Sequence, residues 1–229
     1  MQHFRFRTNL NSTILQQSIS DMKKIILTLA LVAAAATSAF AQIGVGAGYL
    51  NNNTSASSTG EALVTNGFYV EGTYNFNVGN FLSVVPGIRY TFAGDNDAKG
   101  IEIEDIDIAE VSAALTEHNI YVPVMLQANI PVGSAKVFAF AGPTFQFALS
   151  SMLNIAASIG GVGFDTDIDL LGEDGLFKRA DVALGGGVGI EFSHFQVKAA
   201  YDFGLMNRSA VEHETVKGQQ LRIGVAYLF

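Results

Sequence analysis

Apolar and polar residues alternate along much of this chain, most clearly in its last ten residues. In residues 220–229, one side of an extended strand would carry Leu221, Ile223, Val225, Tyr227 and Phe229. The other side would carry Gln220, Arg222, Gly224, Ala226 and a single apolar residue, Leu228. A period of two is that of a β-strand, in which successive side chains point to opposite faces. The pattern therefore predicts a strand that crosses a membrane with its apolar face toward lipid.

Seven further segments precede this one, which gives eight predicted strands at 43–50, 67–76, 81–92, 118–130, 136–149, 179–192, 195–205 and 218–229. The links between them alternate in length. The long links are 51–66, 93–117, 150–178 and 206–217, and the short ones are 77–80, 131–135 and 193–194. Such alternation is typical of an up-and-down barrel with short periplasmic turns and longer outer loops. We therefore predict an all-β fold, an eight-stranded antiparallel transmembrane β-barrel.

The predicted strands separate apolar from polar side chains. Outward positions include Phe68, Val70, Tyr74, Phe76, Ile120, Val122, Val124, Leu126, Phe195, Val197, Tyr201 and Phe203. Inward positions include Thr73, Asn75, Asn119, Gln127, Asn129 and Gln196. Inward glycines, among them Gly44, Gly46, Gly48, Gly185, Gly187 and Gly189, would make room in a narrow interior. The sequence thus predicts a polar lumen.

Charged residues also fall on inward positions. They are Glu71, Arg89, Glu191, Lys198, Asp202 and Arg222, three acids against three bases. This balance favours a network of salt bridges that satisfies buried charge and fills the lumen. A gated polar path is the alternative. An open pore of the porin type is disfavoured because side chains just fill the interior of an eight-stranded barrel.

Aromatic residues and prolines add detail to the predicted strands. The aromatic residues expected in girdles at the membrane interfaces are Tyr49, Phe76, Phe81, Phe92, Phe192, Phe195 and Tyr227. Three prolines, Pro86, Pro123 and Pro143, fall inside predicted strands. Because proline cannot donate a ladder hydrogen bond, we expect β-bulges at these positions.

The start of the chain contains a secretory signal. Residues 22–41 combine two lysines, an apolar stretch at 25–36 and the small-residue sequence Ala39-Phe-Ala41. The apolar stretch is shorter than the roughly 20 residues that a membrane-spanning helix needs. Cleavage after Ala41 is expected, and residues 1–21 are interpreted as the product of a misassigned start codon. The barrel domain is accordingly predicted to span residues 42–229.

Composition narrows the range of functions. Residues 1–41, which precede the predicted barrel domain, contain four of the 13 basic and one of the 21 acidic residues, so the predicted barrel domain has a net charge near −11. This charge disfavours nucleic acid as a partner. The chain has no cysteine, which excludes disulfides, thiolate catalysis and cysteine-based metal sites. After residue 41 no apolar run is long enough for a transmembrane helix.

Two short motifs carry a family resemblance. Residues 118–126 read His-Asn-Ile-Tyr-Val-Pro-Val-Met-Leu, and residues 137–145 read Val-Phe-Ala-Phe-Ala-Gly-Pro-Thr-Phe. Together they resemble the paired strand motifs of the PorT-like outer-membrane β-barrel proteins of Bacteroidota. The resemblance covers residues 42–229 and implies a small barrel of the OmpA or OmpX type in the outer membrane. It carries over no catalytic residue, and nothing in the sequence ties this chain to the secretion machinery of PorT itself.

The C-terminal strand carries a second resemblance. Tyr227 and Phe229 end it as in the sorting signals of bacterial outer-membrane barrels, so we expect it to engage the barrel-assembly machinery. The expected surroundings are outer-membrane lipid and lipopolysaccharide. An extracellular or periplasmic protein partner stays unidentified.

Acidic residues are dense in two of the long links. One link contains Asp95, Asp97, Glu102, Glu104, Asp105, Asp107 and Glu110, and the other contains Asp165, Asp167, Asp169, Glu173 and Asp174. The calcium-loop spacing is not met, since Lys99 and Ile106 occupy ligand positions. A solvated acidic surface is the favoured interpretation. Alternatively, isoleucines between the acids of the first link extend the third and fourth strands as a hairpin with an exposed edge for a partner.

Catalytic signals are weak. His118, His194 and His213 lie in or beside predicted links, and none pairs convincingly with a nucleophile and a carboxylate. The glycine-rich stretches alternate within strands and precede no helix, so a dinucleotide site is rejected. We predict a non-enzymatic barrel without a cofactor or metal, whose role is structural or adhesive through acidic outer loops. The alternatives are a narrow channel, a small lipid-modifying enzyme and a soluble calycin-like barrel.

Overall fold

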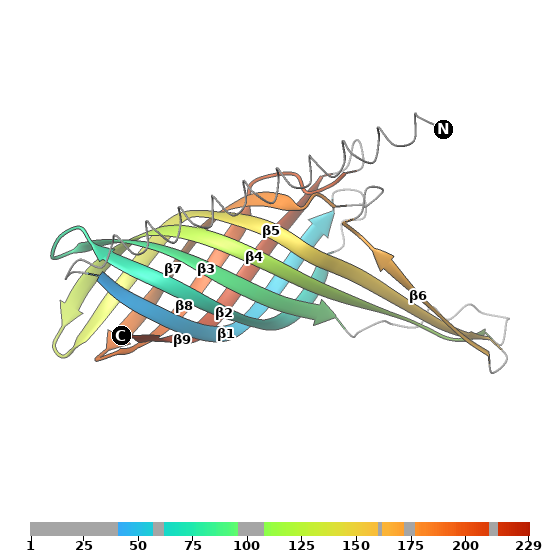
Figure 1. Cartoon of the computed structure of the whole chain (residues 1–229), viewed down its shortest axis with the longest axis horizontal. Coiled ribbons are helices and arrows are strands. Elements are labelled where there is room, and N and C mark those ends of the chain that lie inside the picture. Colours follow the sequence, from blue (N-terminus) through green and yellow to red (C-terminus); the bar gives the residue numbers. More distant parts are fainter. Residues whose placement is uncertain (1–40, 57–61, 96–107, 160–161, 172–176, 211–214) are drawn as a thin grey trace, which may run out of the picture. The chain divides into compact units, whose positions relative to one another are not determined.

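The computed structural model describes residues 41–56, 62–95, 108–159, 162–171, 177–210 and 215–229. Residues 42–229 form one compact unit. Its strands, shown in Figure 1, are β1 (Ala41–Ala56), β2 (Ala62–Asn77), β3 (Leu82–Asp95), β4 (Ile108–Val132), β5 (Ala135–Ile159), β6 (Val162–Asp169), β7 (Ala180–Phe192), β8 (Phe195–Gly204) and β9 (Val216–Leu228). The predicted signal segment and the residues before it lie outside the described residues, apart from Ala41.

Eight of these strands close into an antiparallel barrel. The sheet order is β4-β3-β2-β1-β9-β8-β7-β5, and a further pairing of β4 with β5 completes the ring. The first and last strands meet along a ladder from Gly44 opposite Leu228 to Ala56 opposite Val216. Closure removes the sheet edges that would otherwise expose backbone polar groups to lipid. The predicted eight-stranded transmembrane barrel is therefore confirmed.

A ninth strand, β6, lies outside the ring. It pairs with the far end of β5, from Met152 opposite Asp169 to Ile159 opposite Val162. The same stretch of β5 pairs on its other side with β4, so β4, β5 and β6 form an extension that projects beyond the barrel (Figure 1). The prediction missed β6 because its repeated aspartates read as a solvated loop.

The extension corrects two of the predicted long links. Strand structure occupies residues 108–117 and 150–159, which the sequence assigned to links. The alternative hairpin of the third and fourth strands stays a prediction: the described β3–β4 ladder runs out to Asp95 opposite Leu115, beyond both predicted strands. Residues 96–107, which would form the tip of that hairpin, lie outside the described residues.

The short turns lie where the sequence predicted them, at one end of the barrel. Gly133 and Ser193 begin the two-residue turns between β4 and β5 and between β7 and β8, with φ values of 63° and 57°. A left-handed residue of this kind gives a hairpin turn the twist of its strands. The remaining turn spans residues 78–81. Because long links lie at the opposite end, the short-turn end is periplasmic.

The expected bulges at the three prolines are wrong. The β3–β4 register is the same before and after Pro86, and the β4–β5 register is the same on both sides of Pro123. Pro143 sits within an unshifted β5–β7 ladder, opposite Leu184. A missing proline donor thus weakens individual rungs without inserting a residue. The register shifts in the β4–β5 ladder occur elsewhere, between Ala109 and Val111 and at His118.

Side chains follow the predicted two faces. Outward apolar residues such as Phe68, Leu126 and Phe195 are more than half exposed, as lipid-facing groups are in the absence of lipid. The lumen contains polar groups and a few large rings. Within the described residues no helix is both long and apolar enough to cross a membrane.

Glycines make room for the inward rings, as predicted. A Cβ atom on Gly224 would lie 2.2 Å from the Tyr69 hydroxyl oxygen, and one on Gly189 would lie 2.3 Å from Cζ of Phe138. Such distances are far inside van der Waals contact. The Phe138 ring therefore depends on a glycine of the neighbouring strand β7, and the Tyr69 ring on β2 depends on a glycine of β9, two strands away in the ring.

Candidate functional site

The centre of the lumen is a carboxylate held between two guanidinium groups. Asp202 on β8 accepts a hydrogen bond of 3.0 Å from Nη2 of Arg89 on β3 and bonds of 2.9 Å from Nη2 of Arg222 on β9. All three side chains are almost fully buried. The Arg89 guanidinium also lies 4.7 Å from the ring centre of Tyr121. These contacts join β3 across the lumen to the last two strands, β8 and β9.

The other predicted lumenal charges form two separate pairs. Lys198 contacts Glu71 through an ion pair next to the central group. Glu191 accepts a hydrogen bond of 2.9 Å from Gln196 and forms an ion pair of 2.6 Å with Lys136, nearer the periplasmic end. The structure thus places all six predicted residues in the lumen and arranges them as a central triad and two pairs. The sequence analysis missed Lys136, although this residue occupies an inward position of the fifth predicted strand.

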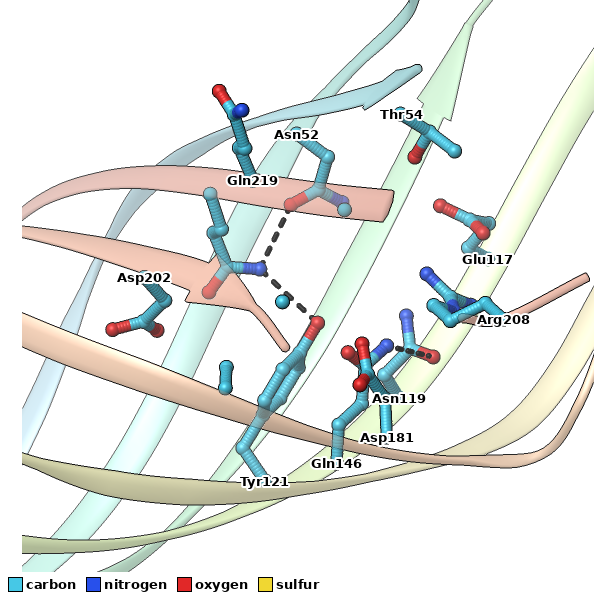
Figure 2. A pocket seen from close by; sticks show the side chains of 14 residues that line it. Asn52, Thr54, Glu117, Asn119, Tyr121, Gln146, Asp181, Asp202, Arg208 and Gln219 are labelled. Carbon is cyan, nitrogen blue, oxygen red and sulfur yellow. Dashed lines mark hydrogen bonds between the residues drawn. The ribbon is translucent and has the colours of Figure 1, made fainter. Parts of the chain in front are cut away.

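A second charged group lies in the outer half of the lumen. Glu117, Asp181 and Arg208 line one cavity there, seen from close by in Figure 2, and all three are buried. Asp181 accepts hydrogen bonds from the backbone N–H groups of Val182 and Met206. Together with Lys136, these residues add two acidic and two basic side chains to the six predicted lumenal charges. The formal charge of the enlarged set is still zero.

Arg208 could not be located from the sequence. It belongs to the predicted link between the last two strands, yet its backbone is fixed at the barrel mouth. Its N–H donates to Val216 at 3.0 Å, and its carbonyl accepts from Lys178 at 2.9 Å. Only this tertiary anchoring turns the guanidinium inward.

Two small cavities flank the central triad. The outer one is lined by Asp202, Gln220 and the second charged group, and the inner one by Arg89, Arg222 and Phe138. In the outer cavity, Gln220 donates hydrogen bonds to Asn52 at 2.8 Å and to Tyr121 at 3.2 Å (Figure 2). Each space admits only a few water molecules. The lumen between them is filled by side chains.

The outer rim of the barrel has a ring of tyrosines. Their hydroxyl groups bond polar side chains on neighbouring strands, in the pairs Tyr49 with Asn66, Tyr90 with His118 and Tyr201 with Gln219. Amphipathic rings in this arrangement mark a membrane interface. The tyrosines therefore indicate the outer interface region of the barrel, where exposed apolar residues such as Phe203 continue a short way beyond them.

The histidines considered for catalysis have structural contacts. His118 shares a hydrogen bond of 2.5 Å with Tyr90 and packs edge-on against Phe92. His194 lies 3.0 Å from the carbonyl oxygen of Leu228 and stacks on Tyr227. His213 lies outside the described residues. In the part of the chain that the structure describes, no three histidine, aspartate or glutamate side chains are grouped as metal ligands.

The C-terminal residues lie on the lipid face of the periplasmic rim. Tyr227 packs against Phe195 and Phe229 with ring centres 5.2 Å and 5.0 Å apart. The backbone N–H of Phe229 donates to Ile43 at 2.9 Å. The expected contact with the assembly machinery stays a prediction, for which Tyr227 and Phe229 have the required outward exposure.

The acidic outer surface is described in part. Asp165, Asp167 and Asp169 alternate along β6 and are all exposed. Asn154 on β5 donates a hydrogen bond of 2.7 Å to Asp167. Asp95 ends β3. The other acids of the two predicted clusters, Asp97, Glu102, Glu104, Asp105, Asp107, Glu110, Glu173 and Asp174, have side chains outside the described residues.

Comparison with known proteins identifies one family model. The model of the outer membrane protein beta-barrel domain matches residues 30–209. None of the curated proteins matches the sequence.

Solved structures resemble the chain at low identity. Ail, the attachment invasion locus protein of Yersinia pestis, is 18% identical, with 83% of this chain and 99% of Ail covered and a TM-score of 0.43. OprG from Pseudomonas aeruginosa is 11% identical, with 83% of this chain and 96% of OprG covered and a TM-score of 0.42. The Neisserial surface protein A is 14% identical, with 82% and 97% covered and a TM-score of 0.40.

Proposed function

This chain belongs to the outer membrane protein beta-barrel domain family and lies in the outer membrane. We propose that it is a non-enzymatic barrel that presents an acidic sheet to a protein outside the cell. The barrel anchors the extension formed by β4, β5 and β6. The observation that carries the proposal is β6 itself, an acidic strand that pairs with β5 alone among the described residues.

Two properties of β6 favour a protein partner. A strand at the edge of a sheet offers unpaired backbone donors and acceptors, to which an extended segment of another protein can add. The exposed carboxylates of Asp165, Asp167 and Asp169 favour partners with basic side chains. The partner is therefore a protein that has a basic segment able to form a β-strand.

The experiment uses a defined probe. The folded protein in lipid nanodiscs is passed over two immobilised peptides, one alternating lysine with valine and one alternating glutamate with valine. We expect the basic peptide alone to bind, and we expect the D165N/D167N/D169N variant to bind it at least tenfold more weakly. T166N/I168N, which changes the opposite face of β6 without changing its charge, is the matched control and should bind as the wild type does.

Equal binding of the two peptides, or equal affinity of the triple variant, would contradict the proposal. Heat-dependent migration on a gel establishes that each variant is folded. High salt should weaken the interaction, because exposed charges are screened within about 8–10 Å at ordinary ionic strength.

The other candidate roles have less support. The filled lumen does not favour a channel. A lipid-modifying enzyme would need a nucleophile and a base together, whereas His118 and His194 are engaged with Tyr90 and Leu228. The PorT-like resemblance of residues 118–126 and 137–145 adds a finer family assignment to the proposal. It implies no reaction.

A further inference from the structure

Two adjacent basic residues stand at the outer rim where β7 begins. Lys178 and Arg179 are both exposed. Arg179 donates from Nη1 to the carbonyl oxygen of Leu149 on β5 at 3.4 Å, and Lys178 donates from Nζ to the carbonyl oxygen of Asn207 at 3.4 Å. These contacts use one donor of each side chain. An arginine has five N–H donors and a lysine three, so both exposed side chains have donors beyond these contacts.

The backbone fixes the height of the pair relative to the membrane. The β5–β7 ladder ends at Phe147 opposite Ala180, and the carbonyl oxygen of Arg179 accepts from the next N–H of β5, that of Ala148, at 2.7 Å. Phe147 is lipid-facing and half exposed. The basic pair is therefore one rung beyond the β5–β7 ladder, at the outer margin of the apolar surface, where lipid headgroups lie.

Large exposed apolar side chains lie on the strand ends that surround the pair. Phe147, Leu149, Leu205 and Met206 are each between 45% and 58% exposed. Leu149 and Met206 belong to the segments that hold Arg179 and Lys178, respectively. A molecule bound here would meet cationic donors at one end and an apolar surface at the other.

The charge of the surroundings makes the pair distinctive. The chain carries a net charge of −8, and its outer extension presents carboxylates. The nearest carboxylate of β6 along the chain, Asp169, accepts a hydrogen bond from the backbone N–H of Leu171 at 2.9 Å. Lys178 and Arg179 are therefore two exposed cationic residues at the outer rim of a protein with a net negative charge.

We infer that Lys178 and Arg179 bind a phosphate group of a glycolipid in the outer leaflet, whose acyl chains lie along Phe147, Leu149, Leu205 and Met206. Guanidinium and ammonium groups are the usual phosphate ligands in proteins, and arginine can bind two phosphate oxygens at once. The apolar side chains select a lipid phosphate over a free one. The inference depends on the outer-membrane location and is independent of the partner proposed for β6.

The test measures binding of bisphosphorylated lipid A to the folded protein in detergent by native mass spectrometry. We expect K178Q and R179Q each to weaken binding by roughly fivefold, the effect of one basic residue at a membrane surface. K178R keeps the charge and should bind as the wild type does. K217Q is the matched control, because Lys217 is also exposed near the outer end of the barrel, on β9, and its loss changes the charge equally.

Three results would overturn the inference. The first is that K178Q and R179Q bind lipid A no more weakly than K217Q does. The second is that fully dephosphorylated lipid A binds as well as the bisphosphorylated form, which would leave the apolar surface alone responsible. The third is that inorganic phosphate at the same concentration displaces lipid A, which would identify a site for the free ion. Heat-dependent gel migration confirms that each variant is folded.

Discussion

At the scale of single residues, Asp202 is the side chain on which the lumen depends most. It is the shared acceptor of Arg89 and Arg222, and all three groups are buried. A buried charge is costly unless it is paired. Arg89 lies on β3, early in the barrel, and Arg222 lies on β9, its last strand. The carboxylate therefore links early and late strands of the barrel.

We predict that D202N lowers the free energy of unfolding by roughly 3–5 kcal/mol, because it leaves two buried guanidinium groups without their carboxylate. Urea unfolding in lipid vesicles, followed by gel migration, measures the change. E191Q is the control. Its partner Lys136 is 35% exposed, so the loss of that pair should cost about 1 kcal/mol or less. Equal costs for the two variants would refute the special role of Asp202.

We also predict that G224A is strongly destabilising, by about 1–3 kcal/mol, the usual cost of overpacking. The added methyl group would lie 2.2 Å from the Tyr69 hydroxyl oxygen. Y69L should relieve the part of this cost that comes from the ring, whereas the contact with the Ala47 carbonyl oxygen at 2.6 Å remains, and a double-mutant cycle of unfolding free energies detects that coupling. G72A is the control, because a Cβ there lies 3.9 Å from its nearest neighbour, Ile88. Additive costs for G224A and Y69L would show that the two positions are uncoupled.

At the scale of elements, the periplasmic turns define how hairpins pair. Ser193 adopts a left-handed conformation, φ 57°, that costs a residue with a Cβ about 1 kcal/mol relative to glycine. Gly133 occupies the equivalent place in the β4–β5 turn without that cost. The sequence of the β7–β8 turn is therefore not optimal for its geometry.

We predict that S193G raises the free energy of unfolding by about 0.5–1 kcal/mol and that G133A lowers it by about 1 kcal/mol. Equilibrium unfolding in urea measures both. G79A, where an added Cβ meets nothing within 4 Å, should change stability little. A destabilising S193G would mean that the serine side chain, rather than its backbone conformation, matters in this turn.

At the scale of the whole molecule, the barrel is an anchor with a filled interior. The central triad separates the two lumenal cavities, and Arg208 lies over the outer one. The extension and the basic rim pair lie at the opposite end from the short turns. The functional surfaces proposed here are thus on the outside of the barrel.

We predict that the purified protein forms no steady unitary conductance in planar lipid bilayers under conditions in which an open porin does. Side chains just fill an eight-stranded lumen, and the buried Asp202 ion pairs lie between its two small cavities. Reproducible single-channel steps from the wild type would contradict the closed lumen and favour the channel alternative. D202N is the control for contaminating porin, because this variant would change the conductance steps only if they arise in the lumen of this protein.

The sequence by itself determined the local features of this protein. Alternation with a period of two located every strand of the barrel. The odd or even position of a residue within its strand also showed which charged side chains face the lumen, namely Glu71, Arg89, Glu191, Lys198, Asp202 and Arg222. It could have added Lys136 and Asp181. Parity is reliable here because lipid and lumen impose opposite polarity on neighbouring residues. The location of the chain in the outer membrane followed from the same pattern.

Only the tertiary structure decided which of these groups meet. Arg89 and Asp202 are 113 residues apart, and their contact depends on how the barrel closes. The same holds for β6, which is a strand only because the end of β5 offers it an edge, and for Arg208, which points inward only because its backbone is anchored at the mouth. The alternation of polar and apolar residues does not predict the register between distant strands. Hydrogen bonds and ion pairs across the lumen form only once the ring is closed.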